Sequence, residues 1–181
     1  MLSLIPELSG TRTLRVLCIG AHCDDIEIGC GATLRVLQKP GRRVSMDWAC
    51  LSGDALRMAE SRKAMAMLVA PRCRGELVFG EFSDGRFPAE YQRIKEFFES
   101  LKRLPRPDLI LCHERDDRHQ ALPEVARIAC DEVVGAAAGG GDRLDRVFEV
   151  APAQGERLLE NLLIDRLDAK NGGEVDEDGR G

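Results

Sequence analysis

The chain has 181 residues, of which 44% are hydrophobic and 31% charged, and its formal net charge at pH 7 is −5. This length suits one domain with a sizeable core. The mild negative charge argues against nucleic-acid binding, because tracking phosphates requires basic patches. No apolar run reaches the roughly 20 residues of a membrane span, and the first ten residues do not resemble a signal peptide. We therefore expect a cytoplasmic protein without nucleic-acid or membrane partners.

The first two thirds of the chain alternate between apolar strand segments and helical segments. Strands are predicted at residues 14–21, 44–51, 76–82 and 108–112, and helices at 29–39, 55–69 and 89–104, with the methionines of the second helix in the core. Fully apolar strands alternating with helices indicate a parallel sheet covered on both faces. The predicted fold class is α/β, a Rossmann-like open, mostly parallel sheet with helices on both faces.

The chain has seven cysteines, and no two of them form a C-x-x-C pair. Several lie in apolar runs, where a thiol packs as a small hydrophobic group. Reduced thiols are the expected state. They are Cys18, Cys23, Cys30, Cys50, Cys73, Cys112 and Cys130.

The pattern changes after Gln120. Helices are predicted at residues 123–138 and 155–169, and a strand at 143–150. The second helix carries a leucine stripe from Leu158 to Leu167, which should dock or self-associate, so we consider a homo-oligomer. Residues 171–181 are acidic and glycine-rich, which favours a disordered tail. We expect a single α/β domain over residues 1–170, followed by this tail.

The turn after the first predicted strand reads GAHCDDIEIGCG over residues 20–31. Open α/β sheets place their sites at this carboxyl end of a strand. His22 and one aspartate can bind a divalent metal, while the other carboxylate stays free to deprotonate a metal-acidified water. Alternatively, Asp24 and Asp25 only cap the next helix. Gly29 and Gly31 form a G-x-G pair, but the dinucleotide-binding motif needs a third glycine that is missing here. The signal for dinucleotide binding is therefore weak.

A second polar cluster, HERDDRHQ at residues 113–120, follows the fourth predicted strand. All three histidines of the chain lie in these two clusters, at positions 22, 113 and 119. Because parallel strands end at the same edge of a sheet, we expect the clusters to be neighbours. Either cluster alone could be a solvated loop. Together, they favour a site.

The segment AHCDDIEIGCGATL resembles the AHPDDxExGxGGTL signature of the LmbE-like (PIG-L) family of metal-dependent N-acetylglucosaminyl deacetylases. The resemblance continues through SGDALRMAESRKAMAML, FSDGRFP and PDLILCHERDDRHQ, and covers about residues 14–120. It implies removal of an N-acetyl group from a small amino-sugar conjugate. Zinc is the expected metal, although Fe(II) or Co(II) would also suit the ligands.

By position, the resemblance implies that His22 and Asp25 are metal ligands and that Asp24 is the general base. His119 would support the oxyanion or protonate the leaving amine. Arg57 would contact the substrate, with an ion pair to Glu60 or Asp54 on the helix surface as the alternative. Cys23 stands where the signature has proline.

The chain departs from the family pattern directly after Gln120. The pattern continues with aspartate and histidine, the latter a third metal ligand, whereas this chain has Ala121 and Leu122. With two ligands left, zinc binding should be weak or absent, unless His113 substitutes. A frame change, recombination, truncation or divergence would each explain the change. An inactive remnant that acts as a binding module is therefore the main rival, and a Rossmann-like nucleotide binder is disfavoured.

Overall fold

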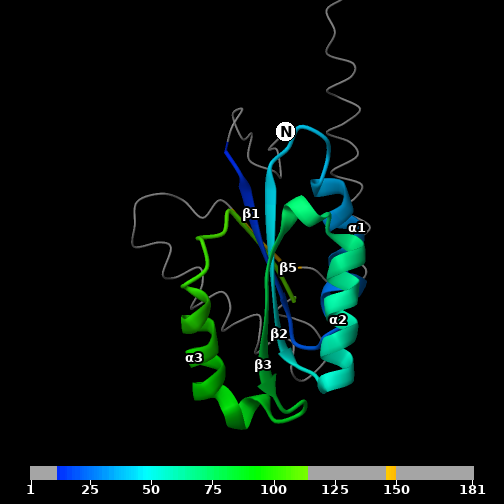
Figure 1. Ribbon diagram of the computed structural model, residues 1–181. Helices are drawn as coiled ribbons and strands as arrows, with labels where there is room; N and C mark the ends of the chain where they lie inside the picture. Colours follow the sequence, from blue (N-terminus) through cyan, green and yellow to red (C-terminus); the bar gives the residue numbers. More distant parts are fainter. Residues whose placement is uncertain (1–11, 114–145, 150–181) are drawn as a thin grey trace, which may run out of the picture.

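The computed structural model describes residues 12–113 and 146–149, which form one parallel sheet with helices on both faces (Figure 1). The elements in chain order are β1 (Leu14–Gly20), α1 (Asp25–Leu37), β2 (Val44–Ser52), α2 (Ala55–Leu68), the 3₁₀ turn η1 (Pro71–Cys73), β3 (Arg74–Phe82), the 3₁₀ turn η2 (Phe87–Glu90), α3 (Tyr91–Leu101), β4 (Leu109–Cys112) and β5 (Arg146–Glu149).

The strands lie in the order β3-β2-β1-β4-β5, and every neighbouring pair is parallel. Helices α1 and α2 pack on one face of the sheet, and α3 packs on the other (Figure 1). Between two consecutive parallel strands the chain must cross back to the end of the sheet where the strands begin. Helices α1, α2 and α3 lie in these crossover connections. The predicted α/β fold class is confirmed.

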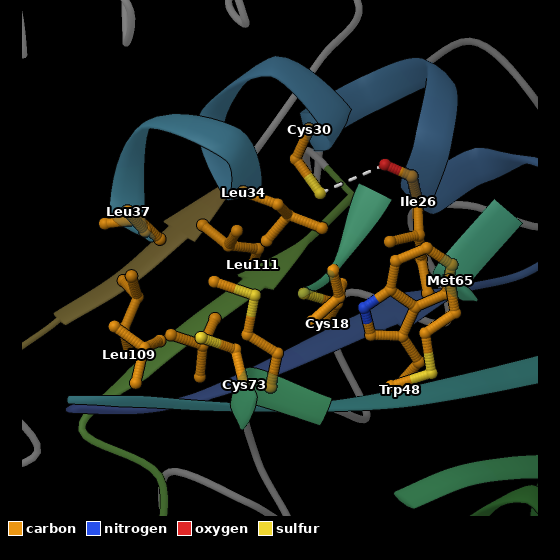
Figure 2. Close-up of a cluster of buried hydrophobic side chains, with 14 of the residues drawn as sticks. Cys18, Ile26, Cys30, Leu34, Leu37, Trp48, Met65, Cys73, Leu109 and Leu111 are labelled. Carbon is orange, nitrogen blue, oxygen red and sulfur yellow. Dashed lines mark hydrogen bonds between the residues drawn. The ribbon is translucent and has the colours of Figure 1, made fainter. Parts of the chain in front are cut away.

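Alternate side chains of β1, β2 and β4 enter two separate cores. The core beneath α1 and α2 is rich in thiols and also contains Trp48 together with Leu109 and Leu111 of β4 (Figure 2). The core beneath α3 is aromatic instead, because Phe82, Phe87 and Phe98 meet there. All six described cysteines are buried, and no disulfide joins two of them. Within the described residues, this agrees with the expectation of reduced thiols.

Two helix predictions need correction. Helix α1 begins at Asp25 rather than residue 29, since the acidic residues of its first turn suit the positive end of the helix dipole. The third helix is interrupted: η2 ends at Glu90, and α3 ends at Leu101 instead of residue 104. Elsewhere, the element boundaries differ from the predictions by two residues or fewer. Strand β5 lies within the strand predicted at residues 143–150, whose other residues are outside the described part of the chain.

The predicted placement of the α2 methionines in the core is also partly wrong, and one leucine of the helix is exposed as well. Met65 is buried, but Leu56 is 69% exposed and Met67 is 79% exposed, so they are not core residues. Helix α2 lies near the edge strand β3, where the sheet offers less surface to cover than it does beneath α1. A helical period in the sequence therefore did not identify the buried face here.

The helices predicted at residues 123–138 and 155–169, with their leucine stripe, lie outside the described residues, as does the tail at 171–181. Among the described helices, none combines the length and apolar character required for a membrane crossing.

Candidate active site at the carboxyl edge of the sheet

The turn between β1 and α1 folds onto itself through Asp25. The backbone N–H of His22 donates to Asp25 Oδ2 at 2.7 Å, and His22 Nδ1 lies 3.3 Å from the same oxygen. The turn is fixed to β2, because the backbone N–H and the hydroxyl of Ser52 both donate to the carbonyl of Ala21, at 2.8 and 2.7 Å. The two predicted metal ligands are thus held together by local geometry.

Cys23 anchors the turn where the family signature has proline. Its side chain is buried, and its thiol donates to the carbonyl of Ser52 at 3.3 Å. A Cβ atom at Gly53 would overlap this sulfur, so only glycine allows the contact. Burial raises the pKa of the Cys23 thiol, which keeps it protonated and a poor nucleophile. Cys23 therefore has a packing role.

His113 reaches the same carboxylate from the end of β4. Its Nε2 lies 3.0 Å from Asp25 Oδ2, and the backbone N–H of Ala21 points at this nitrogen, also at 3.0 Å. Strands β1 and β4 pair in parallel with Cys18 opposite Leu111, which brings their carboxyl ends together. The predicted meeting of the two histidine clusters is confirmed for His113.

Asp84 contacts the second ring nitrogen of His22. It follows β3, and its Oδ1 lies 3.0 Å from His22 Nε2. The end of β3 is irregular: Glu81 has a φ of 56°, and the register against β2 shifts before Phe82. Sequence reasoning used the FSDGRFP segment but did not select Asp84. The signal was its position after a strand, which also identified the other two clusters.

The charges in this cluster support one another. Hydrogen bonding to Asp25, helped by Asp84 and opposed by burial, raises the pKa of His22 to about 9. Burial alone would raise the pKa of Asp25, but its hydrogen bonds with His113 and His22 hold it well below the ordinary value. Burial also raises the pKa of the nearby Glu27 carboxyl. At neutral pH, Asp25 is an anion between imidazole rings.

The remaining predicted site residues stand apart from this contact network. Asp24 occupies the N-cap position of α1, yet its exposed side chain makes no capping hydrogen bond, so the capping alternative does not hold for it. Arg57 is exposed in the first turn of α2, and its backbone N–H donates to Asp54. Within the described residues, the guanidinium makes no ion pair with Glu60 or Asp54. His119, Ala121 and Leu122 lie outside the described residues.

Nitrogen and carboxylate donors suit a divalent metal such as zinc. His22 and Asp25 supply one of each, with side chains only 15% and 20% exposed. However, these donor atoms already contact one another. Across residues 12–113 and 146–149, no three His, Cys, Asp or Glu side chains could hold a metal ion as they stand. The chemistry of the donors fits the metal, and a loaded site requires the donors to separate.

The fold and this edge cluster together define an α/β protein with a histidine–carboxylate site. The model of the PIG-L family, described as GlcNAc-PI de-N-acetylase, matches residues 17–130. The chain therefore belongs to the PIG-L family. A search of curated protein sequences gives no significant match.

Among solved structures, the conserved protein TT1542 from Thermus thermophilus is 25% identical, with a TM-score of 0.60. The match covers 76% of this chain but only 66% of that protein. An N,N'-diacetylchitobiose deacetylase from Pyrococcus horikoshii, solved with an inhibitor, is 17% identical with a TM-score of 0.55, over 84% of this chain and 69% of that one.

The 4-carboxy-2-hydroxymuconate hydratase GalB from Pseudomonas putida KT2440 is also 17% identical with a TM-score of 0.55, and the match covers 92% of both chains. The Pyrococcus protein is named a deacetylase, whereas the Pseudomonas protein is named a hydratase. The shared fold alone therefore does not fix the reaction, which depends on the residues of the site.

Proposed function

We propose that this protein is a zinc-dependent hydrolase that removes an N-acetyl group from a small amino-sugar conjugate. The observation that carries the proposal is the convergence of His22, Asp25, Asp84 and His113 at one sheet edge, in a chain of the PIG-L family. The similarity to a chitobiose deacetylase supports the choice of substrate class.

His22 and Asp25 would hold the cation. A bound divalent cation supplies Lewis-acid polarisation of the acetyl carbonyl and acidifies water. The side chain of Asp24 is exposed and makes no capping hydrogen bond to α1. It would accept the proton of the attacking water. His119 would stabilise the oxyanion or protonate the leaving amine. Arg57, with no ion pair to restrain it within the described residues, would contact the substrate.

The domain organisation belongs to the same proposal. A single α/β domain over residues 1–170 would carry the site, and the acidic residues 171–181 would form a tail outside it. The site would take a small-molecule substrate, and self-association through the leucine stripe from Leu158 to Leu167 would make a homo-oligomer.

An inactive remnant that acts as a binding module is the second candidate. Ala121 and Leu122 favour it, because neither side chain can ligate a metal or orient an imidazole ring. The two candidates predict opposite outcomes for the same assay, since a binding module holds a sugar without turnover.

The test measures acetate release from a panel of N-acetylglucosamine conjugates by zinc-supplied protein. We expect slow turnover by the natural chain and faster turnover by the double variant Ala121→Asp/Leu122→His, which restores the residue types of the family motif. On that background, Asp24→Asn should reduce turnover by about 10²–10⁴-fold while leaving the zinc content unchanged. A double variant that fails to bind zinc would favour the remnant.

A further inference from the structure

The peptide group between Ala21 and His22 connects strand β2 to the Asp25 carboxylate. On one side of this group, the carbonyl of Ala21 accepts hydrogen bonds from the backbone N–H and the hydroxyl of Ser52, at 2.8 and 2.7 Å. On the other side, the N–H of His22 donates to Asp25 Oδ2 at 2.7 Å. Because a peptide group is planar and trans, its C=O and N–H point in opposite directions. Fixing the Ala21 oxygen therefore also fixes the direction of the His22 N–H.

The backbone N–H of His22 is the nearest donor to the Asp25 carboxylate. Within the described part of the chain, the other nitrogens that contact Asp25 Oδ2 belong to imidazole rings, His113 Nε2 at 3.0 Å and His22 Nδ1 at 3.3 Å. A ring nitrogen donates only in one tautomer or in the protonated ring, whereas a backbone amide always carries its hydrogen. The orientation of the carboxylate thus depends first on the His22 amide.

The two donors of Ser52 also make the His22 N–H a stronger donor. Hydrogen bonds to a carbonyl polarise its whole peptide group, and this strengthens the next hydrogen bond by about 10–30% per bond. The effect is larger where water is excluded, because the local dielectric is low. Ser52 is 4% exposed and Ala21 is fully buried, so water does not compete for this carbonyl. Ser52 therefore both aims and polarises the amide that contacts Asp25.

The space beside Ser52 is tightly filled. The thiol of Cys23 donates to the Ser52 carbonyl at 3.3 Å, and a Cβ atom at Gly53 would lie 2.4 Å from this sulfur. A water molecule occupies about 30 Å³, which is more than one hydroxyl group leaves behind. Removal of the Ser52 hydroxyl should therefore leave the Ala21 carbonyl with one donor instead of two.

We propose that Ser52 is a positioning residue for Asp25 and that it acts through the Ala21–His22 peptide group. Its hydroxyl and backbone N–H orient and polarise this group, and the His22 amide then holds Asp25 Oδ2 in place. The inference rests on the proposed function, because Asp25 is one of the two side chains that would hold the cation. It adds a residue of β2 to which the family resemblance assigned no role.

The competing explanation is that Ser52 only stabilises the pairing of β1 with β2. Ser52→Ala separates the two explanations, because it keeps the backbone N–H and removes only the hydroxyl. Ser61→Ala is the matched control, since Ser61 is also buried but its hydroxyl contacts Cys50 Sγ, at 3.7 Å, instead of the Ala21 carbonyl. Ser52→Thr keeps the hydroxyl and should behave like the natural chain. The alanine variants alone decide the question if the added methyl group prevents this variant from folding.

The experiment is NMR of the metal-free, full-length chain. In Ser52→Ala, solvent exchange of the His22 amide should become about 2–10-fold faster relative to the amides of β1, as expected for the loss of one hydrogen bond. The His22 amide proton should also shift upfield, because its hydrogen bond to Asp25 becomes weaker. Ser61→Ala should change the His22 amide no more than it changes the amides of β1. Urea unfolding of each variant checks the fold.

A double-mutant cycle tests the route through the peptide group. Asp25→Ala removes the acceptor of the His22 N–H, so Ser52→Ala on that background should shift the His22 amide proton far less than it does in the natural chain. Equal shifts on the two backgrounds would overturn the inference, because the hydroxyl would then act on the turn independently of Asp25. A change in Ser52→Ala no larger than in Ser61→Ala would overturn it as well.

Zinc calorimetry on the same variants distinguishes this inference from the proposed function. A group that orients a metal ligand typically changes metal affinity by about 10–100-fold, so Ser52→Ala should weaken zinc binding by that factor and Ser52→Thr should restore it. If the natural chain binds zinc and Ser52→Ala binds it equally well, the inference is wrong and the proposed site survives. If the natural chain binds no zinc while the amide changes occur, Ser52 still positions Asp25 and the zinc-dependent function fails.

Discussion

The turn after β1 and the end of β4 contribute to the same cluster in different ways. In the turn, His22 and Asp25 are three residues apart and linked by a backbone hydrogen bond. His113 is 88 positions from Asp25 and meets it only because β4 pairs with β1 in one register. The first contact needs a short segment of chain, whereas the second needs a folded sheet. Weakening the sheet should therefore separate the two histidines.

The largest effect is expected for Leu111→Ala. Leu111 is 2% exposed in the core beneath α1 (Figure 2), and the substitution should cost about 3–4 kcal/mol of unfolding free energy. Ile110→Ala, on the aromatic side of the same strand, is the matched control, with a similar cost. Urea unfolding measures both. In the folded Leu111→Ala variant, the ring NMR signal of His113 should shift further from its position in the unmutated protein than the signal of His22 does. Equal shifts would show that both histidine contacts depend on the sheet to the same extent.

The second effect concerns the shared carboxylate. Asp25→Ala removes the acceptor for the backbone and ring of His22 and for the ring of His113, and should cost about 2–3 kcal/mol in metal-free buffer, given the strength of hydrogen bonds to charged groups. The neighbouring Asp24→Ala should cost about 0.5 kcal/mol or less, since that side chain is exposed and caps nothing. Comparable losses would show that Asp25 is not the centre of the cluster.

A third prediction concerns the pH dependence of the metal-free protein. The pKa of His22 is raised to about 9 in the folded chain, above an ordinary value of about 6.5. The folded state thus binds the proton more tightly, so this contribution to stability is fully present below pH 6.5 and is lost as pH rises through 9. Its size is at most about 2–3 kcal/mol.

Asp84→Asn tests the cause of that shift. The variant should lower the pKa of His22 part of the way toward 6.5, because Asp25 remains the larger contributor. Histidine NMR titration measures the shift. A His22 pKa near 6.5 in the unmutated, metal-free protein would remove the basis for the pH window.

The smallest effect concerns the strained residue that leads to Asp84. Glu81 has a φ of 56°, which favours glycine, so Glu81→Gly should remain within about 1 kcal/mol of the natural chain, with relief of strain offsetting the added freedom of the unfolded state. Glu81→Val keeps the strain and adds a branched side chain, and should be less stable than Glu81→Gly by about 1–2 kcal/mol. Thermal melting ranks the pair, and the reverse order would be contrary to this account.

The sequence alone determined the α/β class, because apolar strands alternating with helices leave few ways to bury both faces of a sheet. The residue pattern also indicated His22 with one of two neighbouring aspartates, and the resemblance to the PIG-L family selected Asp25 of the two. Tertiary structure decided the rest. The exposure of Leu56 and Met67 depends on where α2 lies relative to the sheet edge. The contacts of His113 and Asp84 depend on strand register and on a strained residue in β3, neither of which a local pattern encodes.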